Sequence, residues 1–210
     1  MNANDLQKQY NSGQRNFSGV NLVAAKLADL NLAGINLTGA NLMAAKLTNA
    51  NLSGANLSGA SLTLAQLRGA NLTGAKLSGV RLDGADLSQA NLSRANLSEA
   101  DLTSVNLSMA DLTEANLSRA ILKGGALLIG TELPGADLSE ANLNGAILSG
   151  TNLTNANLTN TNLGEANLSG AKLSGASFNG ANLKEANLLG TNLVDVNFEG
   201  ANLAGAKLMK

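Results

Sequence analysis

The side chains in this chain that could take part in chemistry are mainly carboxylates, hydroxyls and amides. The sequence has 15 acidic and 14 basic residues, a formal net charge of −1, and no histidine or cysteine. Disulfides, Cys/His metal sites, cysteine nucleophiles and histidine-based triads are therefore excluded. Paired carboxylates could still act as general acid and base, so the fold decides whether any two of them meet.

The spacing of these residues does not predict a catalytic or cofactor site. The glycines recur at intervals of five, which suits turns and does not form a Walker or dinucleotide phosphate loop. Rows of asparagine such as Asn31, Asn51 and Asn71 resemble ligand arrays, but stacked amides stabilise one another without a ligand. We therefore expect no catalytic residue, no cofactor, no bound metal and no enzyme activity.

The polar residues are positioned by a five-residue repeat, of which 50–54 and 55–59 are two identical copies. Residues 20–124 contain 21 such fives and residues 126–210 another 17, with leucine as the central residue in 36 of them. The small–polar–leucine alternation predicts a three-residue strand, and the other two residues must turn the chain. Most glycines occupy the fifth position, where a type II turn needs a positive φ. A helix is excluded because a period of five matches neither 3.6 nor 3.5.

A strand–turn unit that cannot bury its own leucine must stack on copies of itself. The pattern Ala-Asn/Asp-Leu-Xaa-Xaa resembles the pentapeptide repeat proteins over residues 15–210, and the opening segment, residues 6–19, resembles cyanobacterial members of that family. The resemblance implies an all-β fold, a right-handed, four-sided parallel β-helix with four fives per coil. Leucine and alanine would point inward and the other three positions outward. At ~4.8 Å per coil, the rod would be roughly 45 Å long.

We expect one domain with a helical cap at its start. Residues 1–14 lie outside the repeat and should form a short helix with Asn4 as its N-cap. Leu6 and Tyr10 are four residues apart, so they share the helix face that would cover the open first coil. Residues 15–210 would then form a single β-helix without a domain boundary.

One residue is inserted near 124–125, where the frame of leucines moves by one position. We expect a bulge there, and apolar side chains that should point outward collect around it: Met109, Ile121, Leu127, Ile129 and Ile147. Such a cluster on a polar rod is typical of a protein-interaction site. Alternatively, the bulge rotates some of these side chains inward.

The sequence contains two further sets of apolar residues at outward positions, one near each end of the rod. Three side chains of the early coils should project beside the N-terminal helix, either packing against it or having no role: Val23, Met43 and Leu64. The last coil has no capping segment, so its unpaired strand groups favour a twofold end-to-end homodimer. Alternatively, the last turn simply frays. The candidate residues for that end are Leu189, Leu208 and Met209.

Residues 20 apart should stack in neighbouring coils, which predicts two further kinds of contact. Opposite charges would neutralise one another across coils: Arg81 with Asp101, Arg94 with Glu114, and Arg119 with Glu99 and Glu140. Four threonines replace alanine at the inward position, where each hydroxyl should bond to the backbone of its own coil: Thr131, Thr151, Thr161 and Thr191.

The pattern favours a non-enzymatic structural or protein-interaction scaffold in the cytoplasm. No apolar run is long enough for a transmembrane helix, and residues 1–16 do not resemble a signal peptide. We expect a protein partner and neither nucleic acid nor membrane as a partner. The resemblance also implies an alternative, a DNA-mimicking protector or inhibitor of a type II topoisomerase (gyrase). That function needs a strongly negative rod and often projecting loops, whereas the net charge here is −1.

Ice binding is the second alternative, because one outward column consists of hydroxyl side chains. Serine dominates this column, and the neighbouring ranks carry asparagine and charged residues in place of a second hydroxyl row. Its members are Ser18, Thr38, Ser58, Ser78, Ser98, Ser118, Ser139 and Thr159.

Overall fold

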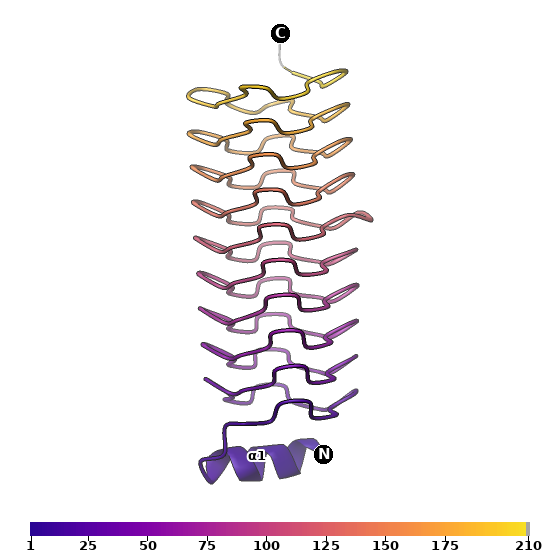
Figure 1. Cartoon of the computed structure of the whole chain (residues 1–210), viewed down its shortest axis with the longest axis vertical. Coiled ribbons are helices and arrows are strands. Elements are labelled where there is room, and N and C mark those ends of the chain that lie inside the picture. The colour runs from indigo at the N-terminus through magenta and orange to yellow at the C-terminus, as the bar shows by residue number, and fades with distance from the viewer. Residues whose placement is uncertain (209–210) are drawn as a thin grey trace.

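The chain forms one short helix followed by a stack of coils, as shown in Figure 1. This computed structural model describes residues 1–208. Helix α1 spans Ala3–Asn11. The strands are so short that each consists of isolated parallel bridges between residues one coil apart, such as Asn16 with Asn36 and Asn21 with Asn41. Four bridges occur in each 20 residues, so four fives make one coil with four sides.

Backbone hydrogen bonds and buried aliphatic side chains hold neighbouring coils together. The N–H of Leu52 donates to the carbonyl of Asn71 at 2.7 Å, and the N–H of Asn51 donates to the carbonyl of Leu30 at 2.9 Å. Each strand is thus bonded to the coil above and to the coil below. Leu52 and Ala55 are fully buried, and each buried leucine contributes about 1.5–3 kcal/mol before entropy is subtracted.

The corner residues explain the polar part of the repeat. The N–H of Ala55 donates to the carbonyl of Leu52 at 3.0 Å, which closes a turn whose third residue, Gly54, has a φ of 64°. The N–H of Ser53 is bound by the side-chain oxygen of Asn51 at 3.1 Å. Asparagine therefore satisfies a turn donor that no backbone carbonyl reaches. Other residues also occupy the left-handed corner position, among them Met109 with a φ of 59°.

Helix α1 covers the first coil but begins earlier than the sequence analysis predicted. The N-cap is Asn2, whose side-chain oxygen accepts from the N–H of Asp5 at 2.8 Å. Asn4 lies inside the first turn, so its assignment as the cap was wrong. Asp5 lies in the first turn, where a negative charge is favourable. As expected, Leu6 and Tyr10 are buried, and the Tyr10 hydroxyl donates to the carbonyl of Ala33 at 2.8 Å.

The coil register changes at the inserted residue. Asp101 still pairs with Ile121, 20 residues away, whereas Asn106 pairs with Leu127, 21 residues away. The spacing returns to 20 when Leu127 pairs with Ile147. Figure 1 shows the corresponding loop extending further from the stack than the loops above and below it.

Two glycines and one serine form the bulge. Gly124 and Gly125 both have positive φ, at 69° and 73°. In the coil below, the N–H and hydroxyl of Ser104 donate to the carbonyls of Lys123 and Gly124, both at 2.9 Å. Within the described part of the chain, no ladder bond is donated by the N–H groups of residues 123–126. The bulge is therefore attached to the coil below it through Ser104, and bonding to the coil above resumes at the carbonyl of Ala126, which accepts from the N–H of Ile147 at 2.9 Å.

The inward threonines only partly follow the prediction. Thr191 donates to the carbonyl of Leu188 in its own coil at 2.7 Å, and Thr151 makes the same kind of bond to Leu148. Two others instead reach the preceding coil: Thr131 donates to Leu107 and Thr161 to Leu138, both at 2.8 Å. The prediction was wrong for these two because a carbonyl of the preceding coil also lies within reach of an inward hydroxyl.

The last coil is held less tightly than the others. Its central residues Leu193, Phe198 and Leu203 are half-buried, whereas the central residues of earlier coils are fully buried. Phe198 is stacked on the ring of Phe178, with 5.2 Å between centroids. In earlier coils, the N–H groups at the third and fifth repeat positions donate to carbonyls of the next coil. Among residues 1–208, the corresponding bonds from residues 173 and 175 to residues 192 and 194 are not formed.

Candidate interaction surface

The carboxylates do not gather into a chemical site. Within residues 1–208, no group of three or more acidic side chains is placed to hold a metal ion. Apart from Asp5 in α1, the acidic residues occupy the outward second, fourth and fifth positions of the repeat, as the sequence predicted. None of the described residues forms a helix with the length and apolar character needed to cross a bilayer.

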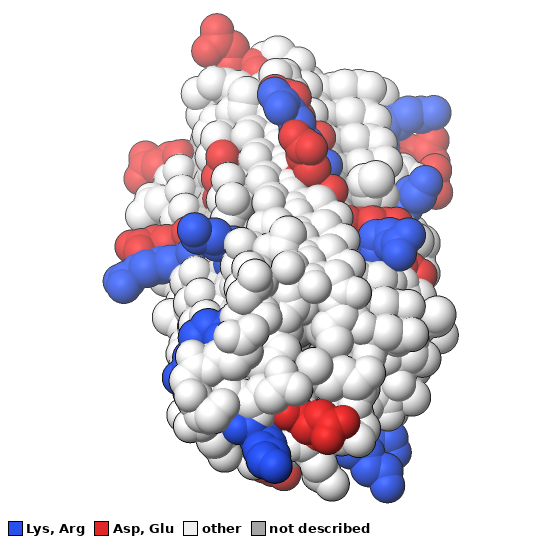
Figure 2. Space-filling view, turned by 60° about the horizontal axis from the view of Figure 1, so that its bottom comes forward, with Lys and Arg blue, Asp and Glu red and all other residues white. Residues whose placement is uncertain are grey.

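Two of the three predicted charge columns form ion pairs. Arg94 contacts Glu114 at 2.9 Å, and Arg119 contacts Glu140 at 3.0 Å and Glu99 at 3.9 Å. The hydrogen bond to Glu140 and its charge raise the pKa of Arg119 above the ordinary value. Figure 2, with the N-terminal end turned forward, shows blue and red side chains adjoining one another between broad uncharged areas.

The third predicted pair is not formed. Arg81 and Asp101 are bridged in adjacent coils, yet no ion pair joins them in the part of the chain that the structure describes. The side-chain oxygen of Asp101 instead accepts from the N–H of Thr103 at 3.0 Å. Aspartate here takes the turn-capping role that asparagine has elsewhere. The prediction of a pair at this position was wrong.

Asparagine side chains bond to one another along their rows, and hydroxyls of the serine-rich column bond to asparagine or to each other, as Ser78 does to Ser58 at 3.3 Å. Asn51 donates to Asn31 at 3.0 Å, and Asn182 donates to Asn162 at 3.0 Å, each across one coil. In the hydroxyl column, Thr38 donates to the side chain of Asn36 at 2.6 Å. These groups are used within the fold, and the rows therefore need no ligand.

An apolar cluster on the outside of the middle coils is the feature that the polar repeat does not explain. We call it the central patch; its members are Met109, Ile121, Leu127, Ile129 and Ile147. Met109 is 68% exposed, Ile129 44% and Ile121 36%, whereas Leu127 and Ile147 are half-buried. Leu127 and Ile147 are bridged to each other at the outward position that asparagine usually occupies. The bulge does not place any of the five among the fully buried residues.

The repeat positions the members of the central patch on neighbouring sides of one stretch of the rod. Leu127, Ile129 and Ile147 belong to one side, and Met109 occupies the corner at which that side ends in the coil below. Ile121 belongs to the preceding side, across the bulge. Every one of these positions follows from the five-residue period and the one-residue insertion, so the sequence alone was sufficient to bring them together.

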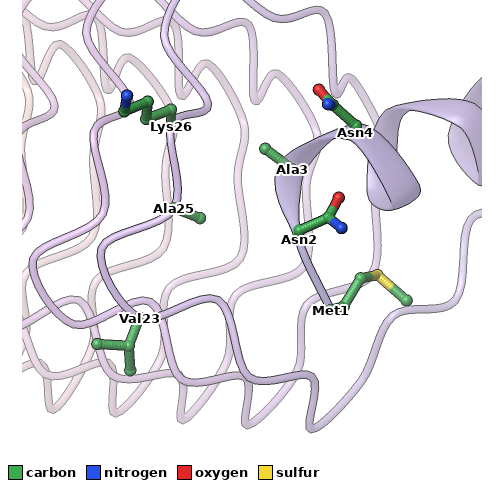
Figure 3. Close-up of a pocket in the computed structure, with 7 residues that line it drawn as sticks. All are labelled: Met1, Asn2, Ala3, Asn4, Val23, Ala25 and Lys26. Carbon is green, nitrogen blue, oxygen red and sulfur yellow. The ribbon is translucent and has the colours of Figure 1, made fainter.

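The early apolar set is also exposed, but it is more scattered. Val23 is 45% exposed, Met43 39% and Leu64 60%. Val23 lines an open pocket of about 420 Å³ between the first coil and the start of α1. Figure 3 shows Val23, Ala25 and Lys26 on the coil side of this pocket, with residues 1–4 on the other. Of the seven lining residues, Lys26 contributes the ionisable side chain and Met1 the N-terminal ammonium group.

The residues proposed for an end-to-end contact lie in and beside the last coil. Leu189 is 45% exposed and Leu208 is 39% exposed. Met209, the third candidate, lies outside the described residues. Val194 is 61% exposed, and the sequence analysis did not select it. It could have been found, because it is an apolar residue at the outward fourth position, as Ile129 is.

A rod of stacked five-residue units with an inward leucine and alanine defines a class of repeat protein, and the comparisons identify its family. The sequence model of the pentapeptide repeats matches in eight copies, and the chain therefore belongs to this family. The matches cover residues 16–54, 45–84, 81–119, 124–160, 151–188, 161–200 and 176–210. The third and fourth matches leave out residues 120–123, next to the inserted residue.

Solved structures of other family members are similar to this chain. HetL, a pentapeptide repeat protein involved in heterocyst differentiation regulation in the cyanobacterium Nostoc sp. strain PCC 7120, is 35% identical. The match covers 98% of this chain and 96% of HetL, with a TM-score of 0.57. A second Nostoc protein, alr5209, is 36% identical over 48% of this chain and 80% of its own, with a TM-score of 0.45.

A more distant likeness concerns the fold alone. Trypsin-treated QnrB1, a plasmid-mediated fluoroquinolone resistance protein, is 20% identical, with 93% of this chain and 91% of that chain covered and a TM-score of 0.52. Comparison with curated protein sequences gives no match.

Proposed function

We propose that this protein is a non-enzymatic cytoplasmic scaffold, wound in the right-handed sense that its family implies, which holds a protein partner against the central patch. The observation that carries the proposal is the exposure of Met109, Ile121 and Ile129 at positions where most other units carry polar residues or glycine. An apolar surface of this kind is stabilised when a partner covers it. The absence of histidine and cysteine from the sequence supports a role in binding over a role in catalysis.

Substitution of the exposed members of the patch tests this function. We expect a Met109→Lys, Ile129→Lys variant to lose a partner that the unmodified rod retains from a lysate of the source organism. Both side chains are exposed, so circular dichroism and the melting temperature should stay nearly unchanged. The measurement is the amount of each co-purified protein, quantified by mass spectrometry.

The chain provides a matched control at the same repeat positions. Leu64, 60% exposed with a φ of 57°, matches Met109, and Val23, 45% exposed, matches Ile129. A Leu64→Lys, Val23→Lys variant adds the same charge and should keep the partner. If both variants retain the same proteins, or if both lose them, the central patch is not the docking site.

We further propose a homodimer through the C-terminal coil, with Leu189 and Leu208 in its contact. The partial exposure of Leu193, Phe198 and Leu203, which are inward residues by their repeat position, supports this proposal. Light scattering should give twice the mass of one chain, and Leu189→Lys should reduce it to the mass of one chain. A single-chain mass for the unmodified protein at high concentration would rule the dimer out.

A further inference from the structure

We infer that the partner segment received by the central patch is cationic as well as apolar, such as an amphipathic helix with lysine or arginine beside its apolar face. The inference rests on the proposed function and adds the chemistry of the partner. It arises from carboxylates that border the patch and that form no ion pair among residues 1–208, although Arg81 lies one coil from Asp101.

Three carboxylates lie directly beside the apolar side chains. Asp101 is bridged to Ile121 in the adjacent coil. Asp111 follows Met109 by two residues, around the corner of the coil, and is bridged to Glu132, which follows Ile129 by three. A partner that covers the apolar side chains would therefore bring its flanking residues to these carboxylates.

These carboxylates differ from other carboxylates in the same stretch of the rod. Glu99, Glu114 and Glu140 each contact an arginine. In the described residues, no ion pair involves Asp101, Asp111 or Glu132. Asp111 and Glu132 even stack as like charges one coil apart, an arrangement that is unfavourable in the free protein and is relieved when a cation binds between them.

Hydrogen bonds to the fold hold the same carboxylates in place. Asp111 accepts from the N–H of Thr113 at 2.9 Å, and Glu132 accepts from the side-chain amide of Asn152 at 2.6 Å. Each carboxylate has a second oxygen free to accept from a partner. Because the groups are already ordered, an incoming cation does not have to fix them, which lowers the cost of binding.

The net negative charge of residues 83–140 also favours a cationic partner. Residues 83–140 contain nine of the 15 acidic residues and three of the 14 basic ones. Two of those three are Arg94 and Arg119, whose charges are already paired; the third is Lys123. A negative field of this kind attracts cationic segments and repels nucleic acid and anionic membranes.

Two synthetic peptides test the chemistry of the partner. One is an amphipathic helix of leucine and lysine, about 12 residues and hence about 18 Å long; the other has glutamate in place of lysine. Fluorescence anisotropy at low salt should show binding of the lysine peptide to the full chain and its weakening as salt rises, because exposed charges are screened. Equal binding of the glutamate peptide would overturn the inference.

Neutralising the bordering carboxylates tests the site. Asp101→Asn, Asp111→Asn and Glu132→Gln together should weaken the lysine peptide about tenfold, since three exposed ion pairs of modest strength are lost. The amides keep the oxygen that accepts from the fold, so folding should be unaffected. The control, Asp137→Asn, Asp195→Asn and Glu199→Gln, removes the same charge elsewhere and should leave the affinity nearly unchanged.

The outcomes separate this inference from the proposed function. If Met109→Lys, Ile129→Lys abolishes capture of the partner while the neutralised carboxylates leave both partner and lysine peptide bound, the patch docks a partner that is not cationic. That result overturns the inference and leaves the function standing. Equal weakening by the carboxylate variant and its control would show that net charge alone matters and would also overturn the inference.

Discussion

The corner residue at the bulge shows how a single position can be doubly constrained. A Cβ on Gly124 would lie 2.9 Å from the Ser104 hydroxyl oxygen and 3.3 Å from the Thr103 methyl group, in addition to the strain of a φ of 69°. At Gly145, with a φ of 66°, a Cβ would have nothing within 4 Å. The two glycines thus separate backbone strain from crowding.

We expect Gly145→Ala to lower the free energy of unfolding by about 1 kcal/mol through its left-handed backbone. Gly124→Ala should cost about 1 kcal/mol more, because the Ser104 side chain must also move. Urea unfolding followed by circular dichroism measures both values. Equal losses for the two variants would show that the bulge is not held against Ser104.

A second prediction at the residue scale concerns pH. The raised pKa of Arg119 means that the folded state binds this proton more tightly than the unfolded state. The stabilisation is fully present below the unfolded pKa of the guanidinium group and is lost as the pH rises through the higher folded pKa. Since the chain has no histidine, we expect a melting temperature that is flat between about pH 6 and pH 9. A clear titration of stability in this range would contradict that expectation.

At the scale of the element, α1 depends on a cap that the sequence did not single out. Asn2 and Asn4 are the same residue type two positions apart, and both precede the residues that face the coil. Pattern alone did not place the start of the helix correctly, whereas the spacing of Leu6 and Tyr10 correctly gave its buried face. Boundaries depend on local hydrogen bonds, while buried faces depend on periodicity, which is easier to read.

Substitution of the two asparagines tests the corrected cap. Asn2→Ala should destabilise α1 by about 1 kcal/mol because the N–H of Asp5 loses its acceptor. Asn4→Ala should change stability by only a few tenths of a kcal/mol, since alanine is favoured inside a helix. Hydrogen exchange of the α1 amides reports both. A larger effect at Asn4 would restore the first assignment of the cap.

At the scale of the whole molecule, charge is distributed along the rod in a way that the net value of −1 conceals. Residues 1–82 contain seven of the 14 basic residues and only two of the 15 acidic ones. Residues 1–82 are therefore positive, residues 83–140 are negative, and residues 141–210, with four acidic and four basic residues, are neutral overall. This polarity disfavours mimicry of DNA, which would need negative charge along the full length, and it places the central patch in the acidic part.

The sequence predicted more of the architecture than of the contacts. Leucine spacing is sufficient to fix the coil length, the insertion and the outward position of residues such as Ile129, because every coil repeats the same geometry. It could not predict that Asp101 would bond to its own turn and leave Arg81 unpaired, or that Thr131 would reach the preceding coil. Those contacts depend on side-chain rotations and short distances that a repeat pattern does not encode.

The most direct test of the account is site-specific photo-cross-linking at the central patch. A photoreactive amino acid in place of Ile129 should cross-link one defined partner in cells of the source organism, and the same substitution at Val23 should not cross-link it. Ultraviolet exposure, purification and mass spectrometry would identify the adduct. A partner that cross-links equally at both positions, or at Val23 alone, would contradict the claim that the protein is a scaffold acting through its central patch.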